Sequence, residues 1–264
     1  MLQLENVSKL FFTGTVNQRV AVRKINLTLE DGDFVTVIGS NGAGKSTLLN
    51  LIAGVYPPDR GRIVLDGKEI TSWEEARRAA WIGRVFQDPA AGTAPRMTIA
   101  ENLAIAYRRG QRRGLQWGLN KALREQIEVA LADLGLGLEH RLQTKVGLLS
   151  GGERQALTLL MATCTQPRLL LLDEHTAALD PSKAALVTQL TERLVAEQRL
   201  TTVMVTHNME QALRLGNRLI MLHSGRILFE IQGSEKRRAT VRDLLEAFHQ
   251  LQGETMTEDE LLMN

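Results

Sequence analysis

At residues 39–47 the chain reads Gly39-Ser40-Asn41-Gly42-Ala43-Gly44-Lys45-Ser46-Thr47, a match to the phosphate-loop pattern G-x-x-x-x-G-K-[ST]. The mostly apolar segment at residues 33–38 precedes it and predicts a buried strand, while residues 45–53 have the pattern of a helix. The glycines let backbone N–H groups approach phosphate oxygens, and the positive end of the helix dipole attracts the same anions. Lys45 adds a charge at the β- and γ-phosphates, and the Ser46 hydroxyl is a ligand for Mg²⁺. Strand, loop and helix together predict a site for a triphosphate.

Strand patterns precede this loop, and strand and helix patterns alternate after it. Residues 2–29 alternate between apolar and polar side chains, which predicts a small antiparallel sheet. Four later strand patterns, with helical patterns between the last three, lie at 62–65, 169–172, 202–205 and 219–222. We therefore expect an α/β fold, in which a phosphate-loop NTPase core with a mainly parallel sheet carries an N-terminal antiparallel β subdomain and an inserted α-helical subdomain.

The expected domain boundaries follow from where these patterns stop. Residues 1–233 form one expected domain, and its helical insertion covers about 88–166, where helices are predicted at 99–108 and 121–134. Residues 234–264 form a short C-terminal helical tail, with an amphipathic helix predicted at 241–251 and an acidic stretch at 254–260.

Two carboxylates, Asp173 and Glu174, follow the strand pattern at residues 169–172. The strand would deliver them to its carboxyl edge, where open α/β sheets bind their ligands. Asp173 suits a Mg²⁺ ion held through its water shell, and Glu174 suits a base that orients and deprotonates the water attacking a γ-phosphate. Alone, the pair could equally cap the following turn, but the phosphate loop upstream favours the catalytic role.

His207 and Gln87 each follow a β-branched or aromatic stretch. His207 comes after residues 202–205 and is expected at the same sheet edge, where it can donate a hydrogen bond to the γ-phosphate. Gln87 follows Val85 and Phe86 and can bridge Mg²⁺ and the attacking water. A lone histidine after a strand is usually structural, and a lone glutamine is a weak signal, so both gain weight only from the other motifs.

A second candidate anion site lies at residues 149–155, which read Leu-Ser-Gly-Gly-Glu-Arg-Gln. Ser150 and Glu153 have the spacing of a capping box before an apolar-periodic run, so the simplest interpretation is a helix start. Gly151 and Gly152 leave backbone N–H groups open to an anion, although the site has no lysine of its own. We therefore interpret this segment as one part of an anion-binding site that residues from elsewhere complete.

The segment 149–155 resembles the signature sequence of the ABC ATPases, and the phosphate loop, Gln87, Asp173-Glu174, residues 178–180 and His207 stand in that family's order and spacing. The resemblance covers nearly the whole chain. It implies the ABC ATPase fold, Mg²⁺-dependent hydrolysis of ATP, and a head-to-tail dimer of two copies of the chain. Each ATP is then expected between one copy's phosphate loop and the other copy's Ser150, Gly151 and Gly152.

The same resemblance assigns two further positions. Phe11 falls where the family has an aromatic residue that stacks on adenine, with Phe12 one position away, and Asp180 falls in the loop at the dimer contact. His175 departs from the family, because many members have proline there. A second histidine near the γ-phosphate and a tolerated loop substitution are the two interpretations of His175.

The resemblance also implies partners. Membrane permease subunits are expected to dock their coupling helices on the surface after Gln87. Residues 88–95 and 173–180 resemble a bacterial importer subgroup that includes motors for tryptophan or tyrosine uptake, which adds an extracytoplasmic solute-binding protein to the expected complex. An exporter motor, or a soluble ABC ATPase of translation or DNA repair, is the alternative.

Composition restricts the remaining classes. Lys+Arg 32 against Asp+Glu 30 leaves a formal charge of +2 over 264 residues, too weak to predict a nucleic-acid partner. The tightest basic cluster, Arg108, Arg109, Arg112 and Arg113, is interpreted as a solvated loop or helix end.

A single cysteine, Cys164, predicts a buried inert thiol and a reducing compartment. Without a targeting or membrane-spanning segment, we expect a peripheral protein on the cytoplasmic face of the inner membrane.

Overall fold

The computed structural model describes residues 1–111 and 119–250 of the chain. A six-stranded sheet forms its centre, in the order β10-β9-β3-β8-β7-β6. Five of these strands run parallel, and β10 pairs antiparallel with β9 at one edge. Their bounds are β3 (Phe34–Gly39), β6 (Ile82–Val85), β7 (Leu169–Asp173), β8 (Thr202–Val205), β9 (Arg218–His223) and β10 (Arg226–Gln232).

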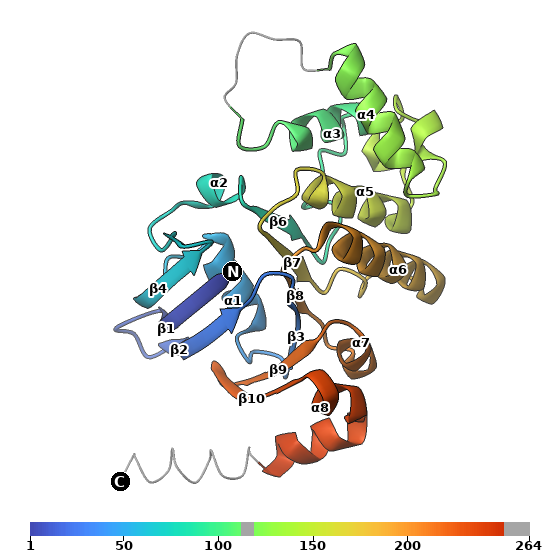
Figure 1. The fold of residues 1–264 in the computed structure, drawn as a ribbon. Coiled ribbons are helices and arrows are strands. Elements are labelled where there is room, and N and C mark those ends of the chain that lie inside the picture. The colour runs from blue at the N-terminus through green and yellow to red at the C-terminus, as the bar shows by residue number, and fades with distance from the viewer. Residues whose placement is uncertain (112–118, 251–264) are drawn as a thin grey trace, which may run out of the picture.

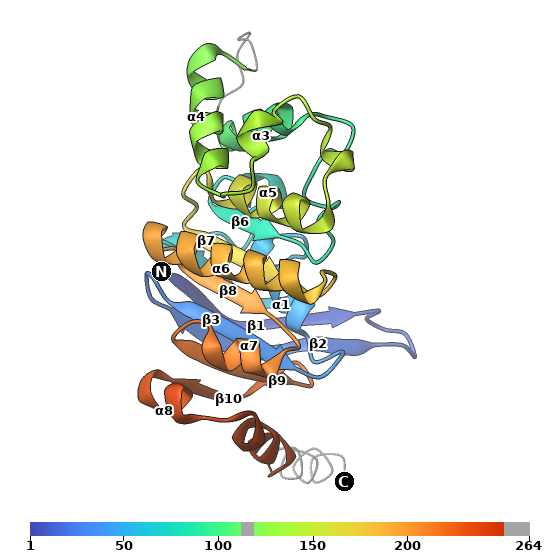
Figure 2. The ribbon, with the colours of Figure 1, turned by 90° about the vertical axis from the view of Figure 1, so that its right-hand side faces the viewer.

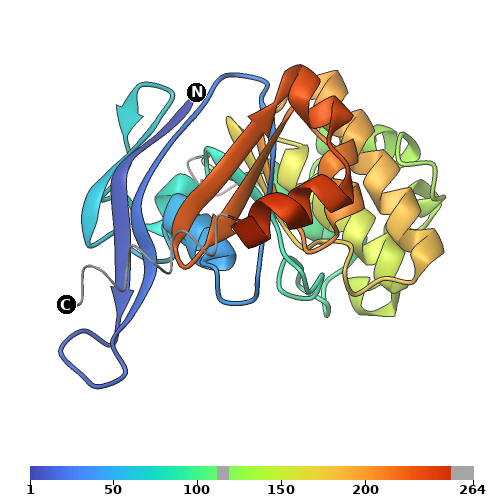
Figure 3. The same ribbon diagram turned by 90° about the horizontal axis from the view of Figure 1, so that it is seen from below.

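A second, antiparallel sheet lies beside the first, in the order β2-β1-β4-β5. It consists of β1 (Leu2–Phe11), β2 (Arg19–Leu29), β4 (Arg60–Leu65) and β5 (Lys68–Glu69). Helix α1 (Lys45–Ala53) lies between the two sheets, as Figure 3 shows, and its apolar residues are buried on both sides. Because α1 is enclosed in this way, the phosphate loop at its start rests on a rigid support.

Buried Arg78, at the end of the short helix α2 (Glu75–Arg78), fixes the other end of α1. Its guanidinium is 1% exposed and donates to the carbonyls of Leu51 and Ile52, in the last turn of α1, at 2.7 and 2.9 Å. It also donates to two carbonyls of the loop before α2, those of Thr71 and Trp73. Burial lowers the pKa of Arg78 to about 10, so the group stays charged at the negative end of the helix dipole.

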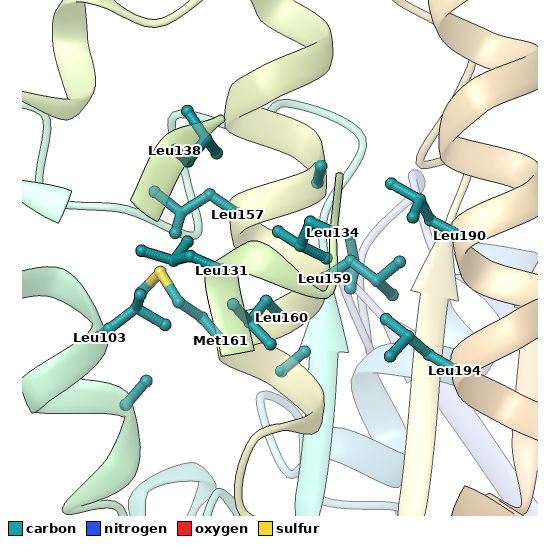
Figure 4. Close-up of a cluster of buried hydrophobic side chains, with 14 of the residues drawn as sticks. Leu103, Leu131, Leu134, Leu138, Leu157, Leu159, Leu160, Met161, Leu190 and Leu194 are labelled. Carbon is teal, nitrogen blue, oxygen red and sulfur yellow. The ribbon is translucent and has the colours of Figure 1, made fainter. Parts of the chain in front are cut away.

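The chain between β6 and β7 is helical in the part that the structure describes, and it lies at the top of Figure 1. It contains α3 (Ile99–Tyr107), α4 (Lys121–Ala132), α5 (Gly151–Thr163) and two single turns, η1 (Leu138–His140) and η2 (Val146–Leu148). Figure 4 shows the apolar side chains that join these helices to α6 (Pro181–Gln198), among them Leu131, Leu157 and Leu190. The same apolar cluster continues into β7, so the helical part and the sheet share a core.

The remaining helices follow β8 and β10. They are α7 (Met209–Arg214), α8 (Gly233–Arg238) and a further helix at residues 241–250. Figure 2 shows α8 and the last helix below the sheet. The amphipathic helix predicted in the tail is therefore present over the residues described, and the acidic stretch at 254–260 lies outside them. No helix within the described ranges is long and apolar enough to cross a membrane.

The predicted fold class is confirmed, with three strands that the sequence interpretation missed and one wrong expectation. The missed strands are β5, β6 and β10. Arg109 is not a solvated residue of the basic cluster, because it is half-buried and its Nη2 donates to the Met161 carbonyl at 2.6 Å. Arg112 and Arg113 lie outside the described residues. Burial raises the pKa of the half-buried Cys164 thiol to about 11, as an inert thiol requires.

Candidate functional site

The phosphate loop joins β3 to α1 and requires glycine at positions where the chain turns closely against its neighbours. Gly44 has φ 103°, and a Cβ placed there would lie 2.3 Å from the Ala21 carbonyl oxygen. Gly39 has φ 151°, and its Cβ would lie 2.2 Å from the Leu222 carbonyl oxygen. Any other residue would push the loop away from the strands beneath it, so these glycines fix the path of the loop.

Lys45 turns back over the loop that precedes it. Its ammonium donates to the carbonyls of Gly39 at 2.7 Å and Ser40 at 3.1 Å. Burial lowers the pKa of Lys45, and the carboxylates of Glu174 and Asp173 oppose that shift. Lys45 is therefore a partly buried cation close to two carboxylates, and a phosphate group can bind to its ammonium.

A pocket of about 310 Å³ opens in front of this loop. Its lining brings together Phe11, Phe12, Arg19, Ala21, Asn41, Gly42, Gly44, Lys45, Ser46, Thr47 and Glu174. Phe12 is 69% exposed, whereas Phe11 is half-buried and meets Tyr56 edge-on at 5.2 Å between ring centroids. Two aromatic rings, the Lys45 ammonium and the Glu174 side chain therefore line one pocket.

Asp173 is the last residue of β7, and it is mostly buried. Burial raises the pKa of its carboxyl, and the Arg84 guanidinium, whose Nη2 lies 3.3 Å from Oδ2, opposes that rise. Arg84 belongs to the neighbouring strand β6 and also stacks on Phe86, with 4.6 Å from the guanidinium carbon to the ring centroid. The sequence interpretation did not find Arg84, because no motif includes it.

Glu174 follows directly in the left-handed backbone region, at φ 44°. Its N–H donates to the Val205 carbonyl at 2.9 Å, which keeps the residue attached to β8, and its Oε2 lies 3.5 Å from Nδ1 of His207. The conformation costs a non-glycine residue about 1–2 kcal/mol. This backbone conformation places Glu174 in the lining of the pocket that contains Lys45.

His207 follows β8, and its side chain is 62% exposed. A glutamine on α7, Gln211, ties its loop to the loop after Glu174. Oε1 of Gln211 accepts from the Thr206 hydroxyl at 2.9 Å, and Nε2 lies 3.4 Å from the hydroxyl oxygen of Thr176. Sequence reasoning missed Gln211, since nothing in the sequence pairs a residue of that helix with Thr176.

Gln87 lies two residues beyond β6, whose Val85 is in register with Leu172 of β7. It is therefore at the same sheet edge as Asp173, but it is exposed and does not line the pocket with Lys45. His175 is also outside the pocket. Its ring is 2% exposed, and Nε2 lies 3.0 Å from the Thr191 hydroxyl of α6. Of the two interpretations of His175, the structure favours a structural substitution.

Ser150 is the N-cap of α5, where it forms the predicted capping box with Glu153. Arg141 holds Glu153 through an ion pair of 2.7 Å. Neither Ser150 nor the two glycines after it line the pocket with Lys45. Asp180 is the N-cap of α6, and Lys183 lowers the pKa of its carboxyl through a hydrogen bond and an ion pair of 2.8 Å. A Cβ at Gly152 would meet the Lys183 side chain at 2.9 Å, so the two helix starts touch.

The residues at the sheet edge are consistent with Mg²⁺ bound together with a nucleotide. Within residues 1–111 and 119–250, no group of three or more His, Cys, Asp or Glu side chains could hold a metal alone. Asp173 and the Ser46 hydroxyl provide oxygen donors close to Lys45. Mg²⁺ commonly takes one or two such protein ligands and completes its shell with phosphates and water.

Comparison with known proteins agrees with this geometry. A family model described as "ABC transporter" matches residues 22–177. A tyrosine transport ATP-binding protein from Clostridioides difficile is 45% identical over 251 residues, which is 94% of this chain and 98% of that protein. A spermidine/putrescine import ATP-binding protein from Haemophilus influenzae is 33% identical over 86% of this chain and 56% of its own length.

Solved structures give the same result. A dimeric ATP-binding cassette in a post-hydrolysis state, bound to ADP and phosphate, matches with a TM-score of 0.75 and 30% identity over 88% of this chain and 98% of its own. A nucleotide-free cassette from an ABC transporter matches with a TM-score of 0.76 and 27% identity over 94% of this chain and 98% of its own. The chain is therefore a member of the ABC transporter ATP-binding family, whose members hydrolyse ATP.

Proposed function

We propose that this chain is a Mg²⁺-dependent ATPase whose catalytic base is Glu174. The observation that carries the proposal is the position of the Glu174 carboxylate, in the pocket with Lys45 and 3.5 Å from His207. Lys45 binds the β- and γ-phosphates, and Glu174 orients the attacking water and accepts its proton. His207 donates to the γ-phosphate. Ser46 and Asp173 are the residues that would hold Mg²⁺, with Gln87 beside them, and the ion supplies charge neutralisation at the phosphates.

Adenine recognition and dimerisation complete this proposal. Phe11, which lines the pocket, stacks on adenine. Ser150, Gly151 and Gly152 bind the γ-phosphate of an ATP held by a second copy of the chain, in a head-to-tail dimer with Asp180 at the contact. Their place outside the chain's own pocket supports this, as does the dimeric state of a similar cassette.

We further propose that the dimer drives import of an amino acid through separate permease subunits at the cytoplasmic face of the inner membrane. A solute-binding protein completes the complex. Support comes from the names of the relatives, which include tyrosine transport and two import systems. In this proposal residues 1–233 are the ATPase domain, with 88–166 as the inserted helical subdomain and 234–264 as the tail.

The first test compares ATP hydrolysis by the wild type and by Glu174→Gln, with dimerisation followed by size-exclusion chromatography in the same samples. Turnover is expected to fall by at least about a hundredfold, because the base is lost while the fold is kept, and ATP should trap the variant as a dimer. Glu210→Gln removes an equal charge from a glutamate near His207 and should behave as wild type. Normal turnover in Glu174→Gln would contradict the assignment of the base.

Transport needs its own test, because an exporter motor carries the same ATPase residues. The chain would be reconstituted with its permease subunits and a solute-binding protein in vesicles, and uptake of labelled tyrosine measured with and without ATP on the ATPase side. ATP-dependent uptake that Glu174→Gln abolishes is the expected result. Movement of solute in the opposite direction would contradict import.

A further inference from the structure

Arg19, at the start of β2, faces the phosphate-loop pocket. In the β1–β2 register it lies directly opposite Phe11, so both side chains leave the sheet on the same face. Both line the pocket that contains Lys45. The strand pairing therefore places a guanidinium beside Phe11 in the lining of the pocket.

The guanidinium also touches the phosphate loop itself. Its Nη2 donates to the carbonyl oxygen of Gly42 at 2.9 Å. A Cβ at Gly42, which has φ 81°, would lie 2.5 Å from that same nitrogen. The loop thus needs glycine at this position both for its backbone conformation and to admit the arginine.

The charge on Arg19 is not neutralised by an ion pair within the described ranges. Among the described residues, the acceptor that its guanidinium reaches is a neutral carbonyl, so the planar fork keeps further N–H groups that can donate to a ligand in the pocket. Phosphate oxygens are the acceptors that such a fork fits best. Lys45 lines the same pocket, and the proposed mechanism places the β- and γ-phosphates on its ammonium.

We propose that Arg19 binds the α-phosphate of the nucleotide, between adenine on Phe11 and the terminal phosphates on Lys45. This inference rests on the proposed function, since it takes the pocket to be an ATP site. It adds a second cation to that site and gives it a role of its own. Lys45 acts at the phosphates that ADP and AMP progressively lack, whereas Arg19 acts at the one that all three nucleotides share.

The test measures dissociation constants of Arg19→Gln for ATP, ADP, AMP and adenosine, by displacement of a fluorescent ATP analogue. Hydrogen bonds to charged groups predict a loss of affinity of about tenfold or more, equal for ATP, ADP and AMP and absent for adenosine. Arg19→Lys keeps the charge without the fork and should lie between wild type and Arg19→Gln. Arg62→Gln removes an equal charge from an exposed ion pair with Glu5 on the same sheet and should bind as wild type.

The outcomes separate this inference from the proposed function. If the wild type binds no ATP, the proposed function fails. If the wild type binds ATP and Arg19→Gln binds all four ligands equally well, only the role of Arg19 fails. A loss that grows from AMP to ATP would also overturn it, because Arg19 would then act by supporting the loop around Lys45. Thermal melting without nucleotide checks that Arg19→Gln is folded.

Discussion

Replacing His175 by glutamine is expected to remove a pH dependence from the stability of this protein. The His175 ring is buried in the folded chain, and burial lowers its pKa from 6.5 to about 4. Between these two values the unfolded chain binds the proton and the folded chain does not. The contribution of His175 to the free energy of unfolding is therefore fully present above pH 6.5 and is lost as the pH drops toward 4.

The size of the effect follows from the two pKa values. The two pKa values differ by about 2.5, and each pKa unit corresponds to about 1.4 kcal/mol of free energy. The largest loss of stability is therefore about 3 kcal/mol. Urea unfolding monitored by circular dichroism, at steps from pH 7.5 to 4.5, would be run on wild type and His175→Gln. Other groups titrate in both proteins, so the difference between the two curves isolates His175.

A matched control is His140→Gln, because the His140 side chain is 83% exposed. Its stability curve should follow that of the wild type. If His175→Gln loses as much stability as the wild type over this range, the buried neutral histidine is refuted. ATP hydrolysis by His175→Gln at neutral pH should remain normal, since the ring lies outside the pocket; a large loss of turnover would restore the interpretation of His175 as a second histidine at the γ-phosphate.

Three further substitutions test the support of the site. Gly44→Ala should weaken ATP binding by about tenfold or more, because its Cβ would clash with the Ala21 carbonyl. The control Gly67→Ala, whose Cβ would meet no atom within 4 Å, should bind ATP normally. Equal binding by the two variants would contradict the role of Gly44. Gln211→Leu should lower kcat about tenfold at nearly constant KM for ATP, because Glu174 and His207 lose their common tie, and a change in KM alone would argue against it. Arg78→Ala should lower the free energy of unfolding by about 3 kcal/mol or more in urea titration, because four carbonyls lose the hydrogen bond from Arg78 and only that of Leu51 is shown to keep another, from the Gly54 N–H. A loss below about 1 kcal/mol would show that these carbonyls find other donors.

The parts of the fold that sequence reasoning predicted are those where local chemistry determines the backbone. Helix α1 begins at Lys45 and ends at Ala53, as predicted, because positive-φ glycines stand at both of its ends. β10 was missed although Ser224 and Gly225, both at positive φ, have the composition of a two-residue hairpin turn. β6 was harder to predict, because its four residues include a glycine and an arginine.

The site shows the same division. The motifs single out Lys45, Ser46 and Glu174, and these three residues line one pocket in the structure. They could not reveal Arg19 or Gln211, because both reach the site through contacts between distant segments. Arg19 depends on the register of a hairpin, and Gln211 on the packing of α7 against the loop after β7. Such contacts are set by tertiary structure. Because neither residue belongs to a local sequence pattern, they could not be predicted from this one sequence.

The left-handed backbone of Glu174 has a consequence for engineering this protein. Glycine adopts that conformation without strain, so Glu174→Gly should relieve it while deleting the proposed base. Directed evolution that selects on heat resistance alone would therefore favour loss of turnover at this residue. A thermostable version of the enzyme has to be selected with hydrolysis as a second criterion, or with position 174 held constant.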